Sequence, residues 1–312
     1  MIASPRRLPA PLSGAALGLL AVAGGTLLAG FAPAAAEAQE VQLRYQFPEG
    51  MDLRYEMIQR SSTSFPGGMG EMVQTMRQGM RMEVVEQVAP DGAVVRNTVE
   101  SIRMDMQSPM GNQSWDSSTE GPPTDPALRP LAALVGMTTE AVLSTDGRVL
   151  EAGDLSDMLE RMAEDMDAET VALLESTMGS EAVETFFAQN FQTLPTEAVS
   201  PGESWDYSMS IPAPGLGTLE TRFIHTLERV EDRGGVRVAL VAITGTLGGL
   251  EPDPDSPMAG VVQFEGGDIS GRMEFDLTNG RILESVTTTL MRMGVMGESV
   301  ASETEVTFRL VD

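Results

Sequence analysis

Apolar and polar residues alternate along most of the chain, which is the pattern of β-strands that bury one face. The first run has apolar side chains at every second position from Val41 to Phe47, and another follows from Met51 to Met57 after a turn at 48–50. The alternation returns in further apolar sets: Met80, Met82 and Val84; Ile102, Met104 and Met106; Trp205, Tyr207, Met209 and Ile211; Ile269, Met273, Phe275 and Leu277; Val306, Phe308 and Leu310. These runs predict an antiparallel sheet with one wet face.

Turn residues separate several of these runs. Asp91-Gly92, Asp146-Gly147 and Asn279-Gly280 each stand between two β-type segments. Such dipeptides adopt the positive φ angles of tight β-turns, so we expect a hairpin at each.

In the middle of the chain the spacing of apolar residues changes from about two residues, as in a strand, to about 3.6 residues, as in a helix. Asp154 is a suitable N-cap for a helix whose apolar stripe is Leu155, Met158, Leu159, Met162 and Met166. Further helical stretches are expected at 168–178 and after Ser180. The pattern therefore predicts a helical insert at 153–195, between a first β meander at 39–152 and a second at 196–312.

Three features of the first β block return in the same order in the second. The turn at 47–50 and the strand that follows it are echoed at 200–203, and the turn at 88–92 is echoed at 230–234. The segment 145–151 (TDGRVLE) matches 278–284 (TNGRILE). Ordered repeats of this kind indicate a duplication.

We therefore expect a mainly β fold of two duplicated antiparallel meanders with a helical insert, forming one compact unit from residue 39 to 312. Two such meanders build either a sandwich or a single curved sheet, a half-barrel, covered by the helices. The pattern leaves both arrangements open.

The N-terminus has the features of a cleavable secretory signal. Arg6 and Arg7 precede a small-apolar run from Ala15 to Phe31, and Ala36 to Ala38 form an A-x-A site. We expect a signal peptide at 1–38 with cleavage near Ala38, and hence a periplasmic or extracellular protein that is not an integral membrane protein after cleavage. The export route, through the general or the twin-arginine pathway, stays open.

Composition narrows the classes of partner and chemistry. The net charge is −26, all basic residues are Arg, and there is no Cys. Nucleic acids and anionic membranes are disfavoured as partners because they require a concentrated positive field. Disulfides are excluded, and the absence of Lys removes Schiff-base mechanisms.

The chain resembles a family of exported bacterial proteins of unknown function. The resemblance rests on Tyr45-x-Phe47-x-x-Gly50 through Tyr55, on 202–205 (GESW) and on the hairpin 271–280 (GRMEFDLTNG). It implies a duplicated β-rich domain and no activity. The expected architecture is also similar, more loosely, to the half-barrels of periplasmic lipoprotein carriers, without any transfer of residue roles.

His225 is the single histidine of the chain, on a strand whose inward set includes Leu219 and Phe223. It is either a metal ligand, a general base or a hydrogen-bonded core residue. No nucleophile-elbow, phosphate-loop or zinc-protease motif accompanies it, and carboxylates are too abundant for spacing to single out a catalytic pair. We expect no catalytic activity, no metal and no cofactor.

Methionine is unusually frequent, with 22 residues against 10 Phe. It either fills the core, or lines an adaptable hollow for lipid or another hydrophobic molecule, or binds Cu(I) through a set such as Met69, Met72, Met76 and Met80. The residues expected to line a ligand cavity are Tyr55, Met57, Met80, Met82, Met104, Met106, Met158, Met162, Met166, Trp205, Tyr207 and His225.

The sequence thus favours an exported, non-catalytic protein that binds or carries a hydrophobic ligand. The alternative is a structural or protein-interaction module with a solid core, and Cu(I) binding comes third. The ligand, the protein partners and the oligomeric state are not determined by the sequence.

Overall fold

The computed structural model describes residues 40–65, 70–88, 92–109, 111–125, 128–153, 184, 187–188, 190–213, 217–252, 262–295 and 298–311. Within these ranges the strands form one antiparallel sheet of 12 strands. The elements are β1 Asp52–Phe65, β2 Gly70–Val88, β3 Gly92–Ser108, β4 Gly111–Asp116, α1 Arg129–Leu134, β5 Thr138–Ser144, β6 Val149–Ala152, β7 Ser204–Ala213, β8 Gly217–Arg233, β9 Val236–Pro252, β10 Val262–Asp276, β11 Arg281–Val295 and β12 Glu298–Val311.

The sheet consists of two meanders that share a hydrogen-bonded junction. Its order is β6-β5-β3-β2-β1-β12-β11-β10-β9-β8-β7, with β4 paired to β3 off this path. The junction is the β1–β12 pair, which runs from Arg54 opposite Val311 to Ser64 opposite Ala301. Of the two arrangements that the sequence left open, the sandwich is therefore excluded, because the two meanders are continuous instead of stacked face to face.

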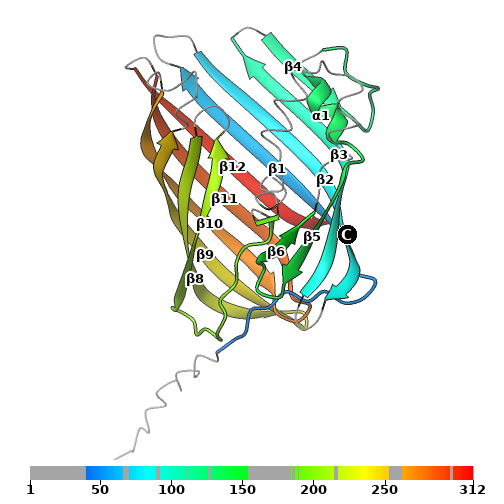
Figure 1. Cartoon of the computed structure of the whole chain (residues 1–312). Helices are drawn as coiled ribbons and strands as arrows, with labels where there is room; N and C mark the ends of the chain where they lie inside the picture. Colours follow the sequence, from blue (N-terminus) through cyan, green and yellow to red (C-terminus); the bar gives the residue numbers. More distant parts are fainter. Residues whose placement is uncertain are drawn as a thin grey trace, which may run out of the picture. The chain divides into compact units, whose positions relative to one another are not determined.

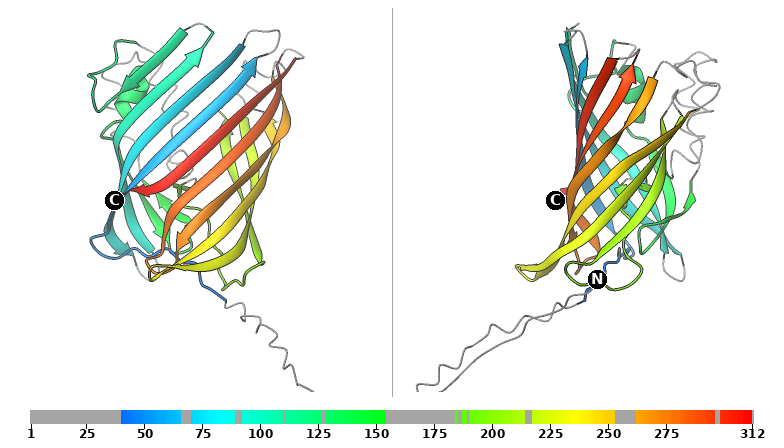
Figure 2. Two further views of the ribbon diagram at one scale, coloured as in Figure 1. Left: turned by 180° about the vertical axis from the view of Figure 1, so that it is seen from behind. Right: turned by 90° about the vertical axis from the view of Figure 1, so that its left-hand side faces the viewer.

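The sheet curls strongly, so that one face is concave and the other convex (Figures 1 and 2). Gly245 shows how the curvature is accommodated: a Cβ at this position would lie 2.6 Å from the Arg222 carbonyl oxygen. Only a residue without a side chain permits this approach of β8 to β9. The predicted hairpins at Asp146-Gly147 and Asn279-Gly280 are confirmed between β5 and β6 and between β10 and β11.

The segment from Val41 to Phe47 is not the strand that its alternation predicts. Val41 makes an isolated bridge with Val199, and the segment otherwise bonds to turns. Tyr45 N donates to Thr145 O at 2.8 Å, and Gln46 N donates to Gly280 O at 3.0 Å. The segment packs across the β5–β6 and β10–β11 turns and closes one end of the concave face. This packing buries its apolar side chains even though it is not a strand of the sheet.

The described apolar core lies on the concave face in two clusters. The larger joins residues of both meanders with the segment 41–47 and with Phe187, Phe191 and Leu194. The smaller consists of Val99, Ile102, Met104, Trp115 and Leu128, and α1 residues pack against it. Alternating inward side chains of a curved sheet need such packing partners on the hollow side.

The predicted helical insert at 153–195 falls largely outside the described residues, and with it Met158, Met162 and Met166. Glu184, Phe187, Ala188 and Asn190 do have helical conformation. A helical cover of the sheet stays a prediction. Duplication stays a prediction too, because strands that follow one another in sequence commonly pair with each other whether or not a chain is duplicated. The two meanders also differ, since β4 and α1 are inserted in the first one.

Residues Met1–Glu37 and Ala38–Asp312 form separate units, and the first of them lies outside the described residues together with the predicted signal. None of the helices within the described ranges is long and apolar enough to cross a membrane.

Candidate functional site

The end of the concave face near the 41–47 segment is packed solid. Met80 and Met82 are 0% and 1% exposed, and Tyr55 donates a hydrogen bond to the Ile282 carbonyl oxygen at 3.2 Å. The void against Tyr55, Met82 and Phe191 measures about 20 Å³. A void of this size has room for about one water molecule, so it cannot receive a lipid chain. The predicted cavity residues Tyr55, Met80 and Met82 therefore belong to the core.

Methionines form a half-buried surface on the concave face of β2 and β3. Met76 is the direct partner of Met104, and Met106 is the partner of Gln74. Met104 is buried against Trp115, and Met76 and Met106 pack on the same cluster while staying half-buried. Thioether side chains are flexible and polarisable, so this methionine surface can adapt to an apolar group of variable shape.

The strands at the centre of the sheet carry hydroxyl and amide groups on the same concave face. Ser61 Oγ lies 3.1 Å from Thr304 Oγ1, and Thr63 Oγ1 lies 3.1 Å from Ser302 Oγ. All four side chains are half-buried. This hydroxyl surface adjoins the methionine surface, because Ser61 is also the partner of Gln74 on β2. The concave face is therefore amphipathic beyond the packed core.

His225 sits at the other side of the concave face in a stack of aromatic rings. Its ring lies 5.3 Å from that of Trp205 and 5.4 Å from that of Tyr207. His225 is 0% exposed, and its Nε2 lies 2.7 Å from Gln192 Oε1. Gln192 Nε2 in turn donates to Ser285 Oγ at 2.9 Å. The interpretation of His225 as a hydrogen-bonded core residue is confirmed.

Burial also sets the protonation of these groups. Desolvation lowers the pKa of His225 to about 4, and it raises the pKa of Tyr207 above its ordinary value. A neutral imidazole that donates from Nε2 to an amide oxygen has only Nδ1 as a base, and no partner of Nδ1 lies among the described residues. The geometry holds His225 as a structural residue.

A cleft of about 640 Å³ opens beside this stack, between edge strand β7 and the β5–β6 turn. Tyr207, Met209 and Val149 give it apolar surface, and Arg148 and Glu184 give it charge. Tyr207 thus belongs to both the aromatic stack and the cleft wall. Of the predicted cavity residues that the structure describes, only Tyr207 borders this opening.

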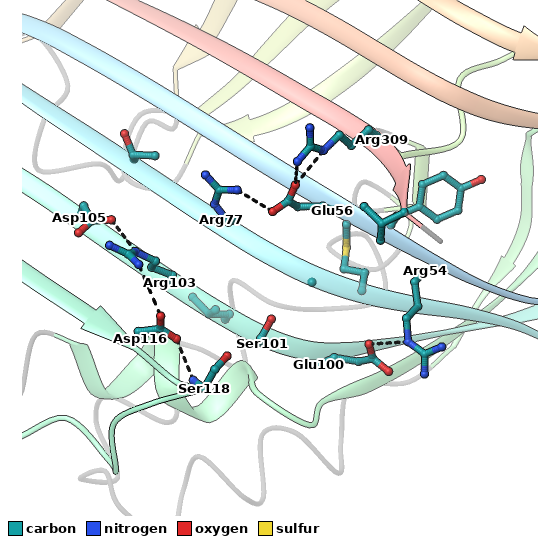
Figure 3. A pocket seen from close by; sticks show the side chains of 16 residues that line it. Arg54, Glu56, Arg77, Glu100, Ser101, Arg103, Asp105, Asp116, Ser118 and Arg309 are labelled. Atoms are coloured by element: carbon teal, nitrogen blue, oxygen red, sulfur yellow. Dashed lines mark hydrogen bonds and ion pairs between the residues drawn. The ribbon is translucent and has the colours of Figure 1, made fainter.

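The convex face carries a hollow of about 740 Å³, lined by Ser101 and Gly79 among others (Figure 3). Four arginines and four carboxylates line it: Arg54, Arg77, Arg103 and Arg309 with Glu56, Glu100, Asp105 and Asp116. Three hydrogen bonds run between strands: Arg77–Glu56 at 2.8 Å, Arg309–Glu56 at 2.8 Å and Arg54–Glu100 at 3.1 Å. Arg103 donates to Asp105, two residues along the same strand, at 2.9 Å. Glu56 lies between two guanidinium groups (Figure 3).

These pairs neutralise the convex hollow. Partial burial raises the pKa of Glu56, but hydrogen bonds from Arg77 and Arg309 outweigh it and hold the pKa below the ordinary value. The lining has equal numbers of each charge in a chain of net charge −26, so it offers no positive field to an anion. The arrangement is that of a solvated face with cross-strand ion pairs.

The described residues contain no cluster of His, Asp or Glu suited to a metal ion. Of the predicted Cu(I) set, Met69 lies outside the described residues, and Met72 and Met80 lie on the same strand, β2. Eight residues of a strand span roughly 26 Å, so the two sulfurs cannot ligate one ion. Met57, the remaining predicted cavity residue, is half-buried beside the main core.

The sequence pattern missed two buried polar side chains on the concave face, Asn97 and Thr139. They are 1% and 4% exposed, and they are direct partners across β3 and β5. The signal was present for Asn97, because a polar residue stands at an inward position between Val95 and Val99. The neighbourhood of Thr139 was not visible in the sequence, since the two residues belong to separate strands.

Comparison with known proteins gives the family without an activity. No curated protein matches the chain. Among solved structures, DynF from the dynemicin biosynthesis pathway of Micromonospora chersina matches at 10% identity over 88% of this chain and 85% of that chain, with a TM-score of 0.20, and we infer nothing from so low a score. A model described as "Family of unknown function (DUF6263)" matches residues 93–282, which is more than half of the chain. The resemblance to a family of unknown function is thereby confirmed: the protein belongs to this family.

Proposed function

We propose that the protein is a non-catalytic binding protein whose concave face receives an amphipathic small molecule such as a lipid. The observation that carries this proposal is the continuous half-buried surface in which Met76 and Met106 adjoin Gln74 and Ser61. An apolar chain would contact the methionines, and a polar group would contact the hydroxyls and amides. Ligand sites are typically apolar surfaces with few convergent polar groups.

The absence of catalysis belongs to this proposal. His225 is enclosed by aromatic rings and hydrogen-bonded to Gln192, so it lacks the access that a general base needs. The carboxylates lining the convex hollow either pair with arginines or lie on its solvated surface. Export to the periplasm or the cell exterior, inferred from residues 1–38, completes the proposal.

The second candidate is a structural or protein-interaction module with a solid core. It is favoured by the packed end of the concave face, where Leu43, Met80 and Phe275 are all 0% exposed. The two candidates differ in whether the methionine surface binds a ligand or merely supports the fold.

The test is native mass spectrometry of the full chain after incubation with monoolein, a neutral single-chain lipid. A one-to-one adduct that disappears on denaturation is expected for the wild type. Met106→Glu places a charge in the methionine surface and should remove the adduct. Ile224→Glu is the matched control, because Ile224 lies on the convex face and is 38% exposed.

If neither the wild type nor the control carries monoolein, the binding proposal fails and the solid-core candidate replaces it. An adduct that survives equally in Met106→Glu places the ligand elsewhere and contradicts the proposed surface.

A further inference from the structure

The hydroxyl surface of the concave face is part of a longer row of polar side chains. Gln74 of β2, Ser61 of β1, Thr304 of β12 and Thr289 of β11 are direct partners from one strand to the next. Residues directly opposite each other on antiparallel strands point to the same face of the sheet, so these four side chains form one polar row. All four are half-buried. Neighbouring strands lie about 4.8 Å apart, so the polar row is roughly 14 Å long.

The side chains on both sides of the polar row are uncharged. On each strand, the residues two positions before and two positions after the row point to the same face. These flanking residues are Met72, Thr63, Ser302 and Met291 on one side, and Met76, Gln59, Val306 and Thr287 on the other. The row therefore offers no counter-charge to an ionised group at these positions.

The charged residues of the same strands point to the convex face. Arg60 precedes Ser61 on β1, and Glu305 follows Thr304 on β12, so both point away from the polar row. Arg60 donates to Glu305 on that opposite face, at 3.2 Å. The strands thus separate ion pairs on the convex face from uncharged hydrogen-bonding groups on the concave face.

The polar row keeps hydrogen-bonding capacity for a ligand. Ser61 Oγ and Thr304 Oγ1 lie 3.1 Å apart, so one of these hydroxyls donates to the other. A hydroxyl offers one donor and two acceptor sites, and a carboxamide offers two N–H donors and a carbonyl acceptor. The pair therefore retains one O–H donor and further acceptor sites, and Gln74 adds both kinds of group beside it.

These properties select a class of ligand head group. An ionised head group would lose its hydration without meeting an opposite charge, which is costly. The chain's net charge of −26 also repels anions. An uncharged group with several hydroxyls can donate to and accept from the row at more than one point along its length.

We propose that the polar row binds an uncharged head group with several hydroxyls, such as a sugar, while the adjoining methionine surface holds the apolar chain. This inference rests on the proposed function, whose ligand class it narrows. It assigns the site to glycolipids and sugar esters instead of fatty acids, phospholipids or cationic amphiphiles.

The test compares three probes that share a decyl chain and differ in their head group. Decyl maltoside is uncharged and polyhydroxylated, decyl sulfate is anionic, and decyltrimethylammonium is cationic. Calorimetric titration of the full chain is carried out below the micelle-forming concentrations, at about 0.15 M salt to screen long-range attraction to the acidic chain. Decyl maltoside should bind about tenfold more tightly than either charged probe.

Two substitutions remove hydroxyls of the polar row with little change of shape, Thr289→Val and Thr304→Val. Valine suits a strand, so both variants should fold. Each should weaken the binding of decyl maltoside about fivefold, since one net hydrogen bond is worth about that factor. The binding of the charged probes should change less than about twofold.

Thr288→Val and Thr307→Val are the matched controls. They make the same substitution on the same two strands, at half-buried residues that point to the convex face. Both controls should bind decyl maltoside as the wild type does.

The outcomes separate this inference from the proposed function. If the wild type binds none of the three probes, the proposed function fails and this inference fails with it. If the wild type binds the charged probes as tightly as decyl maltoside, or if the row variants bind decyl maltoside no more weakly than the controls, then only the assignment of the polar row is overturned.

Discussion

His225 is held as a neutral imidazole because folding removes it from water. Its ordinary pKa of 6.5 falls to about 4 through burial. Its partners among the described residues are neutral, namely the Gln192 amide and the rings of Trp205, Tyr207 and Phe223. Protonation is therefore more favourable in the unfolded chain than in the folded one.

This difference predicts a loss of stability as the pH falls from about 6.5 to about 4. Linkage gives about 3 kcal/mol by pH 4, because the unfolded chain binds a proton that the folded chain does not. His225→Phe has no histidine to protonate, so this acid-induced loss is absent from the variant. If the variant is less stable than the wild type at pH 7, the difference between their unfolding free energies should therefore be about 3 kcal/mol smaller at pH 4. Urea titrations of both proteins between pH 7 and pH 4 measure it.

Proton NMR checks the cause directly, because the chain has a single histidine. Its imidazole resonance should titrate near pH 4 in the folded protein and near pH 6.5 in urea. A folded-state midpoint above pH 6 would show that the ring is not desolvated.

At the scale of secondary-structure elements, the 41–47 segment packs directly on the β10–β11 turn. Gly280 has φ +60°, and a Cβ there would lie 2.5 Å from Gln46 N. Gly234, in the β8–β9 turn, has nearly the same φ of +65° but open space where its Cβ would be. The two glycines therefore differ only in whether a second element packs on the turn.

Gly234→Ala should cost about 1 kcal/mol of unfolding free energy, which is the penalty for a side chain at positive φ. Gly280→Ala should cost about 3 kcal/mol, because the new methyl group also displaces the 41–47 segment. Urea denaturation of both variants measures the difference. Equal costs would contradict the packing of this segment on the turn.

At the scale of the whole molecule, the two meanders share a β1–β12 junction and a core. Tyr55 of β1 stacks on Phe308 of β12 at 4.4 Å, and the larger cluster contains residues of both meanders. Shared burial of this kind couples the two parts energetically, so we expect a single unfolding transition for Ala38–Asp312.

The two tryptophans test this coupling, since Trp115 belongs to β4 and Trp205 to β7. In Trp115→Phe and Trp205→Phe the remaining indole reports one meander only. In each variant the fluorescence midpoint in urea should coincide with the midpoint of far-ultraviolet circular dichroism. A fluorescence transition that precedes or follows the loss of β-structure would mean that the meanders unfold independently.

The residues that sequence reasoning placed well are those whose environment depends on near neighbours. The alternation around Met80, Met104 and Phe308 correctly predicted buried inward faces, and Asn279-Gly280 correctly predicted a hairpin. The same alternation was misleading at 41–47, because packing on turns buries one face of an extended segment as well as a sheet does.

The sequence by itself determined that this is a β-rich chain with defined inward faces and tight turns, because side-chain period and turn propensity are local properties. Only the tertiary structure decided that the meanders join through β1 and β12, that Gln192 meets His225, and that Asn97 meets Thr139. Which strands pair depends on contacts between residues that are distant along the chain. The alternation of side chains within one strand is the same whichever strand lies beside it, so it cannot reveal the partner.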